Sequence, residues 1–156
     1  MQSTLNLSAE GTVLWSLADV ESVLRSCRVI AVLGCHPERS RPAHDVPAYL
    51  HALGRTILPV NPRYAQTTLF DVEVKARLQE LAPAVVDVVN VFRRSADIAA
   101  HVDDILAMRP LAALVWLQSG IQDAASCALL RAAGIDTVED RCMLADGRAL
   151  GLCGTG

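Results

Sequence analysis

Hydrophobic residues along this chain form two alternating patterns. One is a short, nearly continuous apolar run, which occurs five times, at residues 28–34, 56–61, 85–92, 112–117 and 136–139. Apolar runs without polar alternation are typical of strands whose two faces are both buried. The five runs are therefore predicted to be the strands of a sheet that is covered on both sides.

The second pattern is helical periodicity in the segments between these runs. Apolar side chains three or four positions apart predict four helices between the strands. Their apolar faces are Val46, Tyr49, Leu50 and Leu53, then Val74, Leu78 and Leu81, then Ile98, Val102, Ile105 and Leu106, then Ala125, Ala128, Leu129 and Ala132. Asp45 and Ser95 are predicted to cap the first and third of these helices. A further helix, capped by Ser16, precedes the first strand.

Strands that are joined by single helices pair in parallel through right-handed crossovers. The sequence therefore predicts an α/β fold with a single Rossmann-like, doubly wound sheet of five parallel strands and an extra N-terminal helix. The expected strand order, counted along the chain, is 3-2-1-4-5. Residues 1–27 would form the helical extension and residues 28–144 the Rossmann-like domain. Residues 145–156, which lack a clear period, would form a Gly-rich tail.

Composition and charge narrow the classes of function. The chain has 156 residues, of which 52% are hydrophobic, and its formal net charge is −3. No broad basic field attracts nucleic acid, and no apolar stretch is long enough to cross a membrane. The five cysteines are an odd number without a CxxC pair, which argues against a disulfide framework or a zinc site. Reduced thiols favour a cytoplasmic protein.

Open α/β sheets bind ligands beyond the carboxyl ends of their strands, so the loops there are the candidate site. The loop after the first strand begins at Gly34, but the rest of the GxGxxG phosphate-binding pattern is absent. The loop instead carries Arg39 and Arg41, and Pro37 stiffens it. Arginine ahead of a helix N-terminus suits a phosphate group. The alternative is a loop whose arginines are only solvated.

The loop after the second strand carries Asn61, Pro62 and Arg63. Dinucleotide-binding domains that prefer NAD place a carboxylate there to hold the ribose, and this loop has none. An arginine suits an extra phosphate on the adenosine ribose, as in the 3′-phosphate of coenzyme A (CoA) or the 2′-phosphate of NADP. The alternative is a turn set by the Asn-Pro pair, with an exposed arginine.

Two further loops complete the candidate site. Phe92 and Arg93 follow the third strand, where an aromatic ring can flank an adenine or a pantetheine arm and a guanidinium can reach a phosphate. Phe92 as an ordinary core residue is the alternative. Gln118 follows the fourth strand and can hydrogen-bond an amide-bearing ligand, while Gly120 lets a ligand approach the backbone closely.

Taken in order, these segments resemble the small bacterial and archaeal CoA-binding proteins, the YccU-like group of the CoA-binding domain family. That domain is related to the CoA-binding domain of the succinyl-CoA synthetase α subunit. The matching pieces are VIAVLG, RPAHDVPAYLHALG, ILPVNPRY, VVDVVNVFRRS, VWLQSG and EDRC, which span residues 29–142. The resemblance implies a Rossmann-like domain that binds CoA or an acyl-CoA and catalyses no reaction of its own.

The resemblance also implies which part of CoA each loop contacts. In chain order, Gly34, Cys35 and His36 would approach the diphosphate, Pro62 and Arg63 the adenosine and its 3′-phosphate, Val91, Phe92 and Arg93 the middle of the ligand, and Gln118, Ser119 and Gly120 the pantetheine arm. The chain departs from the family pattern at His36 and Ala43, where many relatives have hydroxyl residues, and at Pro47, where alanine is usual. A ring N–H of His36 is the expected substitute for a lost hydroxyl donor.

Other functions stay open at this point. No GxSxG, HExxH or P-loop motif is present, so the sequence identifies no catalytic or metal-binding residue. One alternative is an NADP-dependent reductase, which Arg63 permits, and another is an interaction scaffold whose nucleotide site has decayed. A homodimer is compatible with a domain of this kind, and no protein partner is identified. Cys35 and Cys142 fall in ligand-facing loops, where a mixed disulfide with CoA is a hypothesis.

Overall fold

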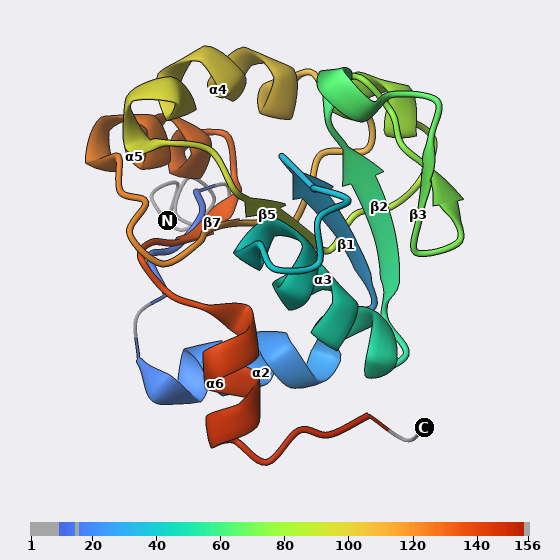
Figure 1. Ribbon diagram of the computed structural model, residues 1–156. Coiled ribbons are helices and arrows are strands. Elements are labelled where there is room, and N and C mark those ends of the chain that lie inside the picture. The colour runs from blue at the N-terminus through green and yellow to red at the C-terminus, as the bar shows by residue number, and fades with distance from the viewer. Residues whose placement is uncertain (1–9, 15, 155–156) are drawn as a thin grey trace, which may run out of the picture.

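The computed structural model of the protein describes residues 10–14 and 16–154. Five parallel strands form its main sheet (Figure 1), and each lies within one of the five apolar runs. They are β1 (Val29–Leu33), β2 (Thr56–Val60), β5 (Val88–Val91), β6 (Leu114–Leu117) and β7 (Asp136–Val138). The predicted α/β class, with one Rossmann-like parallel sheet and an extra N-terminal helix, is confirmed.

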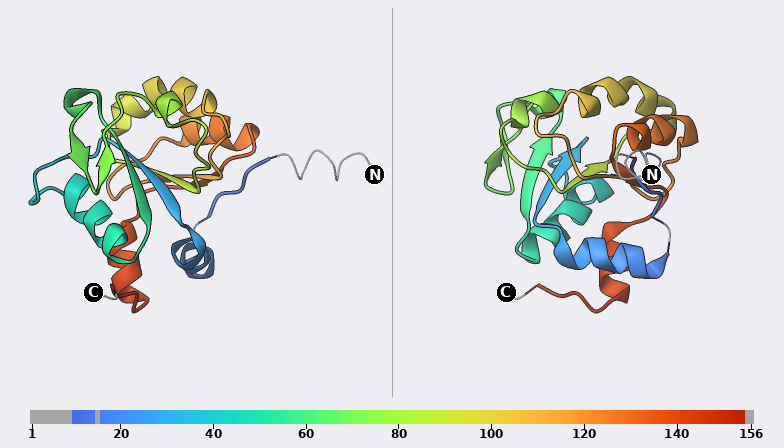
Figure 2. Two further views of the ribbon diagram at one scale, coloured as in Figure 1. Left: turned by 90° about the vertical axis from the view of Figure 1, so that its right-hand side faces the viewer. Right: turned by 180° about the vertical axis from the view of Figure 1, so that it is seen from behind.

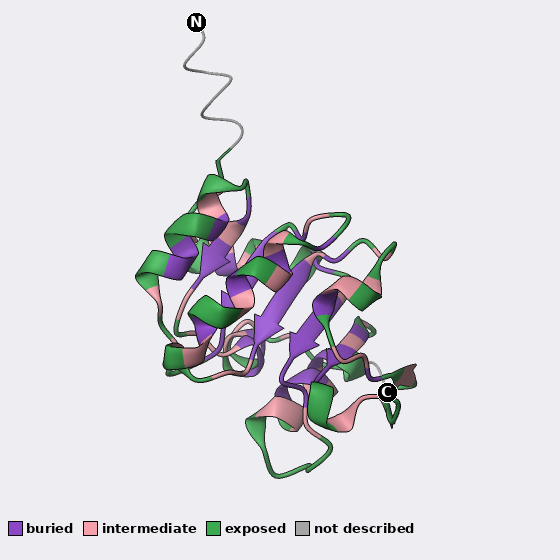
Figure 3. Ribbon diagram, turned by 90° about the horizontal axis from the view of Figure 1, so that it is seen from above, coloured by how far each residue is buried: buried purple, intermediate pink, exposed green. Residues whose placement is uncertain are grey.

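Helices cover both faces of this sheet, as Figures 1 and 2 show. Helices α4 (Ile98–Leu106) and α5 (Ala124–Ala132) pack on one face, and α2 (Leu17–Ser26), α3 (Pro42–Ala52) and α6 (Met143–Ala149) pack on the other. Successive side chains of a strand point to opposite faces of the sheet, so the side chains on both faces must be apolar. The strands are accordingly buried along most of their length (Figure 3). Within the described residues, no helix is long and apolar enough to cross a membrane.

The strand order differs from the prediction. The observed order is β2-β1-β5-β6-β7, which is 2-1-3-4-5 in chain order where 3-2-1-4-5 was expected. Pro59 in β2 gives the physical reason, because proline has no N–H and is restricted to edge strands. On the outer edge of β2, Lys75 N donates to Pro59 O at 3.0 Å and Asn61 N donates to Lys75 O at 2.9 Å. A full strand cannot pair there, so β5 pairs with β1.

The predicted helix of Val74, Leu78 and Leu81 is absent, and this prediction was wrong. The chain between β2 and β5 instead forms a 3-10 turn η1 (Pro62–Tyr64), a hairpin of β3 (Thr68–Leu69) and β4 (Val72–Glu73), and a second 3-10 turn η2 (Leu78–Leu81). Phe70 and Asp71 make the hairpin turn with φ of 53° and 67°. Two successive residues in the left-handed region form the turn that suits a two-residue hairpin. The hairpin occupies the segment just before Val74, where the predicted helix would begin.

Two of the three predicted helix caps differ from the structure. Ser16 caps α2 as expected, since its Oγ accepts a hydrogen bond from Asp19 N at 3.1 Å. Helix α3, however, begins at Pro42 with Arg41 as its N-cap, one turn before the position that Asp45 would cap. Proline fits the first helical position because its missing N–H would have no partner there. Ser95 begins the 3-10 turn η3 (Ser95–Asp97), and its Oγ accepts from Gln122 N at 3.0 Å.

Helix α5 exists as predicted, but it buries a different face. Its buried residues are Ser126, Cys127 and Leu130, whereas the predicted face of Ala125, Ala128, Leu129 and Ala132 is exposed. Alanine occurs all round this helix and gains little from burial, so alanine periodicity does not identify the inner face. Cys127 and Leu130, three positions apart, are the better signal.

Part of the predicted C-terminal tail is helical. Residues Met143–Ala149 form α6, which buries Met143 and Leu144. Gly147 lies so close to α3 that a Cβ there would be 2.5 Å from Tyr49 Oη. This glycine therefore allows two helices to pack closely, and the Gly-rich composition misled the prediction.

Near the N-terminal end of the described residues, Val13 forms a parallel bridge with Thr137 of β7.

Candidate functional site

The loops at the carboxyl ends of the strands enclose two adjoining pockets. The first, here the Arg63 pocket, has a volume of about 350 Å³ and lies between the loops that follow β1, β2 and β5. The second, the Gln118 pocket, has a volume of about 680 Å³ and lies between the start of α3 and the loops that follow β5 and β6. Arg41, Ala43, Phe92 and Arg93 line both pockets, so the two pockets adjoin, and together they are here called the groove.

The structure brings most of the predicted site residues to this groove. The Arg63 pocket contains Gly34, His36, Arg41, Asn61, Pro62, Arg63, Phe92 and Arg93, and the Gln118 pocket adds Ser119 and Gly120 to Gln118 itself. The remaining predicted residues lie elsewhere. Cys35 and Val91 are core residues, and Pro37 is exposed at the tip of its loop. Arg39 lines a separate pocket together with His44, Asp45 and Ala48.

Pro47 determines how the first loop meets helix α3. Within a helix the N–H at position 47 would bond to the carbonyl of Ala43, but proline has no N–H. The freed Ala43 carbonyl accepts a hydrogen bond from His36 N at 3.2 Å instead. Helix α3 therefore still begins at Pro42, and this hydrogen bond connects the first loop to the first turn of the helix. The backbone N–H of His36 is thus bonded within the protein.

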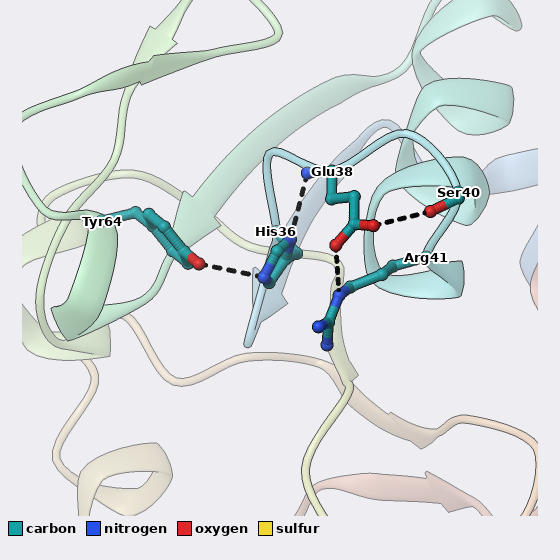
Figure 4. A network of polar contacts seen from close by, with 5 residues as sticks. All are labelled: His36, Glu38, Ser40, Arg41 and Tyr64. Carbon is teal, nitrogen blue, oxygen red and sulfur yellow. Dashed lines mark hydrogen bonds and ion pairs between the residues drawn. The ribbon is translucent and has the colours of Figure 1, made fainter.

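The side chain of His36 is also held at both ring nitrogens, as Figure 4 shows. Glu38 N donates to His36 Nδ1 at 3.0 Å, and His36 Nε2 lies 3.0 Å from the hydroxyl of Tyr64. Burial and the nearby charge of Arg41 lower the pKa of His36, which favours the neutral ring. Both ring nitrogens therefore contact groups of the protein, which are the Glu38 N–H and the Tyr64 hydroxyl. That a ring N–H replaces the family's hydroxyl donor stays a prediction.

Asn61 holds the first and second loops together. Its Nδ2 donates to Cys35 O at 2.9 Å, and its Oδ1 accepts from Arg63 N at 3.1 Å. The side chain is buried, and its two polar ends are both satisfied within the protein. Asn61 therefore positions Arg63, whose guanidinium lies at the groove.

The Arg63 pocket carries positive charge. Arg41, Arg63 and Arg93 line it, and no Asp or Glu does so in the part of the chain that the structure describes. Arg41 Nε pairs with Glu38 at 2.8 Å on the exposed side of the loop. Arg63 and Arg93 form no ion pair among the described residues, and Arg93 Nε is buried without a hydrogen-bond partner there. Such a cluster attracts an anion with several acceptor oxygens.

The Gln118 pocket is more apolar and is held in shape by neighbouring loops. Asp140 Oδ1 accepts from Gly120 N at 2.6 Å, and Asp140 Oδ2 accepts from Gln122 Nε2 at 3.0 Å. Gln118 is buried at the pocket wall, and its Oε1 has no hydrogen-bond partner among residues 10–14 and 16–154. An unpaired buried amide oxygen is costly, so this pocket suits a ligand or water that donates a hydrogen bond.

The two cysteines of the ligand-facing loops have different surroundings. Cys35 is fully buried, and desolvation raises the pKa of its thiol to about 12. A thiol with so high a pKa is a poor nucleophile at neutral pH. Cys142 is half-buried and lines the Gln118 pocket, where its Sγ accepts a hydrogen bond from Ala145 N at 3.4 Å. The mixed-disulfide hypothesis therefore stays open only at Cys142.

The predicted site did not include several residues that line the groove, among them Tyr64, Arg94 and Ile121. Tyr64 directly follows the Asn61–Arg63 loop, so its position in the chain was the available signal. Trp116, by contrast, lies in β6 one residue before its end and is fully buried, and its Nε1 donates to Arg141 O at 2.8 Å.

The fold is that of a Rossmann-like domain, and a groove lined by arginines lies at the carboxyl ends of its strands. A model of the CoA binding domain family matches residues 28–148, and the chain belongs to that family.

Relatives of the chain support the same fold. The uncharacterized protein YneT of Bacillus subtilis is 28% identical over 128 residues, which cover 82% of this chain and 91% of YneT. A solved structure from Thermus thermophilus is similar with a TM-score of 0.81 at 40% identity, covering 87% of this chain and 99% of that one. A hypothetical protein from Pyrococcus horikoshii has a TM-score of 0.78 at 24% identity, covering 87% and 92%, and shows the likeness of fold alone.

Proposed function

We propose that the protein binds CoA or an acyl-CoA along the groove and acts as a binding module without catalysis of its own. The observation that carries the proposal is a groove in which arginines lie beside a buried amide oxygen without a partner. Arg41 and Arg93 line both pockets, and no carboxylate lines either one among the described residues. Arg63 belongs only to the first pocket, whereas Ile121 and the unpaired amide oxygen of Gln118 belong only to the second. CoA likewise carries phosphates at one end and a neutral, amide-bearing arm at the other.

The Arg63 pocket suits the phosphates of the nucleotide end. It lies beyond β1 and β2, where Rossmann-like domains hold the diphosphate and the adenosine ribose of their ligands. Arg63 follows β2 directly, at the position whose charge decides between a free ribose hydroxyl and a ribose phosphate. The guanidinium of Arg63 therefore favours the 3′-phosphate of CoA.

The Gln118 pocket suits the pantetheine arm. The arm carries two amide groups, and an amide N–H would satisfy the unpaired Oε1 of Gln118. Phe92 lies where the two pockets meet and offers an apolar surface to the chain between the amides. The pocket also contains Cys142, so the thiol end of the ligand has room near this residue.

A charge reversal at Arg63 tests this proposal. Arg63→Glu places a carboxylate against the bound phosphate, and the expected loss of CoA affinity is about 30-fold or more. Arg39→Glu is the matched control, because Arg39 is also exposed in the same region but lines a different pocket. It changes the net charge equally and should alter the affinity by less than about threefold, since distant surface charges are screened by salt. Equal losses in the two variants would contradict a phosphate contact at Arg63.

A further inference from the structure

Tyr64 is a groove residue that is absent from the predicted site residues and from the implied CoA contacts. It lies in η1 and lines the Arg63 pocket. Its hydroxyl is 3.0 Å from His36 Nε2, and the two rings meet edge to face with centroids 5.0 Å apart (Figure 4). The Arg63 guanidinium lies over the Tyr64 ring at 5.6 Å from its centroid. The hydroxyl is therefore held by an imidazole, and a guanidinium lies over the ring that carries it.

The hydrogen bond between these two side chains has only one consistent direction. Glu38 N donates to His36 Nδ1, so this ring nitrogen carries no proton. A neutral imidazole must then carry its proton on Nε2, and Nε2 donates to the oxygen of Tyr64. The opposite direction would need a proton on Nδ1, where it would face the Glu38 N–H. The O–H of Tyr64 is thus left free to donate elsewhere.

We infer that Tyr64 is a specificity-determining residue of the groove, whose free O–H donates to the 3′-phosphate of bound CoA. This inference rests on the proposed function and deepens it. The hydroxyl borders a pocket lined by Arg41, Arg63 and Arg93, so the acceptor placed there is anionic. Tyr64 belongs to the loop after β2, which in Rossmann-like domains contacts the substituents of the adenosine ribose. A phosphate on that ribose is a monoester with three free oxygens that can accept hydrogen bonds.

The inference also gives His36 a role. His36 donates to the Tyr64 oxygen, so the hydroxyl accepts a hydrogen bond from the imidazole. The proton of the Tyr64 hydroxyl then points away from His36. His36 is thereby a positioning residue, which acts on the ligand through Tyr64.

Titrations with CoA and with 3′-dephospho-CoA test the inference. Tyr64→Phe removes only the hydroxyl and should weaken CoA binding about tenfold, as expected for a hydrogen bond to a charged group. Its affinity for 3′-dephospho-CoA should stay within about twofold of the unchanged protein, because the lost partner is then absent. Tyr49→Phe is the matched control, since the chain has two tyrosines and the Tyr49 hydroxyl donates to Leu152 O on the far side of α3.

Each other outcome overturns the inference in a distinguishable way. If Tyr64→Phe binds both ligands as tightly as the unchanged protein does, the hydroxyl makes no contact. If it loses the same factor for both, the hydroxyl does not recognise the 3′-phosphate. If the unchanged protein binds CoA and 3′-dephospho-CoA equally, the pocket does not recognise the 3′-phosphate. If it binds neither ligand, the proposed function itself fails.

The direction of the hydrogen bond can be measured without any substitution. Nitrogen-15 chemical shifts of the His36 ring distinguish the two neutral tautomers in the folded, unliganded protein. A proton on Nε2 is the expected result. A proton on Nδ1 would mean that Tyr64 donates to His36, and its hydroxyl would then have no proton to offer a phosphate.

Discussion

Replacing Gly34 by alanine tests how closely the first loop is built against the neighbouring strand. Gly34 has φ of +89°, and a left-handed conformation costs an L-residue about 1–2 kcal/mol. A Cβ at this position would also lie 2.5 Å from Phe92 O, well inside contact distance. Forcing such a contact apart in a packed region costs about 1–3 kcal/mol. The two effects together predict that Gly34→Ala lowers the free energy of unfolding by about 2–5 kcal/mol.

Gly54→Ala separates these two contributions. Gly54 has nearly the same φ, +86°, but a Cβ there would meet no atom within 4 Å. It should therefore lose only the conformational part, about 1–2 kcal/mol. Urea unfolding of both variants, followed by circular dichroism, measures the difference. Equal losses for Gly34→Ala and Gly54→Ala would refute the argument that the carbonyl of Phe92 excludes a side chain at position 34.

Two further predictions concern a buried hydrogen bond and the thiols. Trp116→Phe leaves the Arg141 carbonyl without its 2.8 Å donor, and urea unfolding should show a loss of about 2–4 kcal/mol; a loss below about 0.5 kcal/mol would contradict this role. Iodoacetamide should modify Cys142 and Cys153 in the folded, reduced protein but spare the three buried thiols, which are Cys27, Cys35 and Cys127. By intact mass, saturating CoA should protect Cys142 alone, and protection of Cys153 or labelling of Cys35 would contradict the arrangement of the site.

The sequence predicted the parallel sheet well because its strands are buried on both faces. The strands of the central sheet make continuous apolar runs, which are typical of strands with two buried faces. The strand order was not predictable from the runs themselves. It depended on Pro59, whose missing N–H restricts β2 to the edge and brings β5 beside β1.

Helices were predicted less well where the periodic residues were few or small. Val74, Leu78 and Leu81 are spaced as on a helix, yet the turn at Phe70 and Asp71 makes a hairpin in the same connection. In α5, exposed alanines concealed the buried pair of Cys127 and Leu130. Short windows of this kind allow several periods, and tertiary packing decides among them.

At the candidate site, the positions of the loops were predictable but the contacts within them were not. The rule that ligands bind at the carboxyl ends of strands placed Arg63, Arg93 and Gln118 at one groove. The link from Pro47 through the Ala43 carbonyl to His36 joins residues that no spacing rule connects. No spacing rule connects His36 with Tyr64 either, because these two side chains belong to different loops.

The central claim is that the groove binds CoA, and a calorimetric titration of the reduced protein tests it most directly. The protein is first stripped of any carried ligand and is then titrated with CoA and, separately, with NADPH. The account predicts a micromolar or tighter dissociation constant for CoA, about −8 kcal/mol, and binding of NADPH at least about tenfold weaker. No heat with CoA, or tighter binding of NADPH than of CoA, would contradict the account.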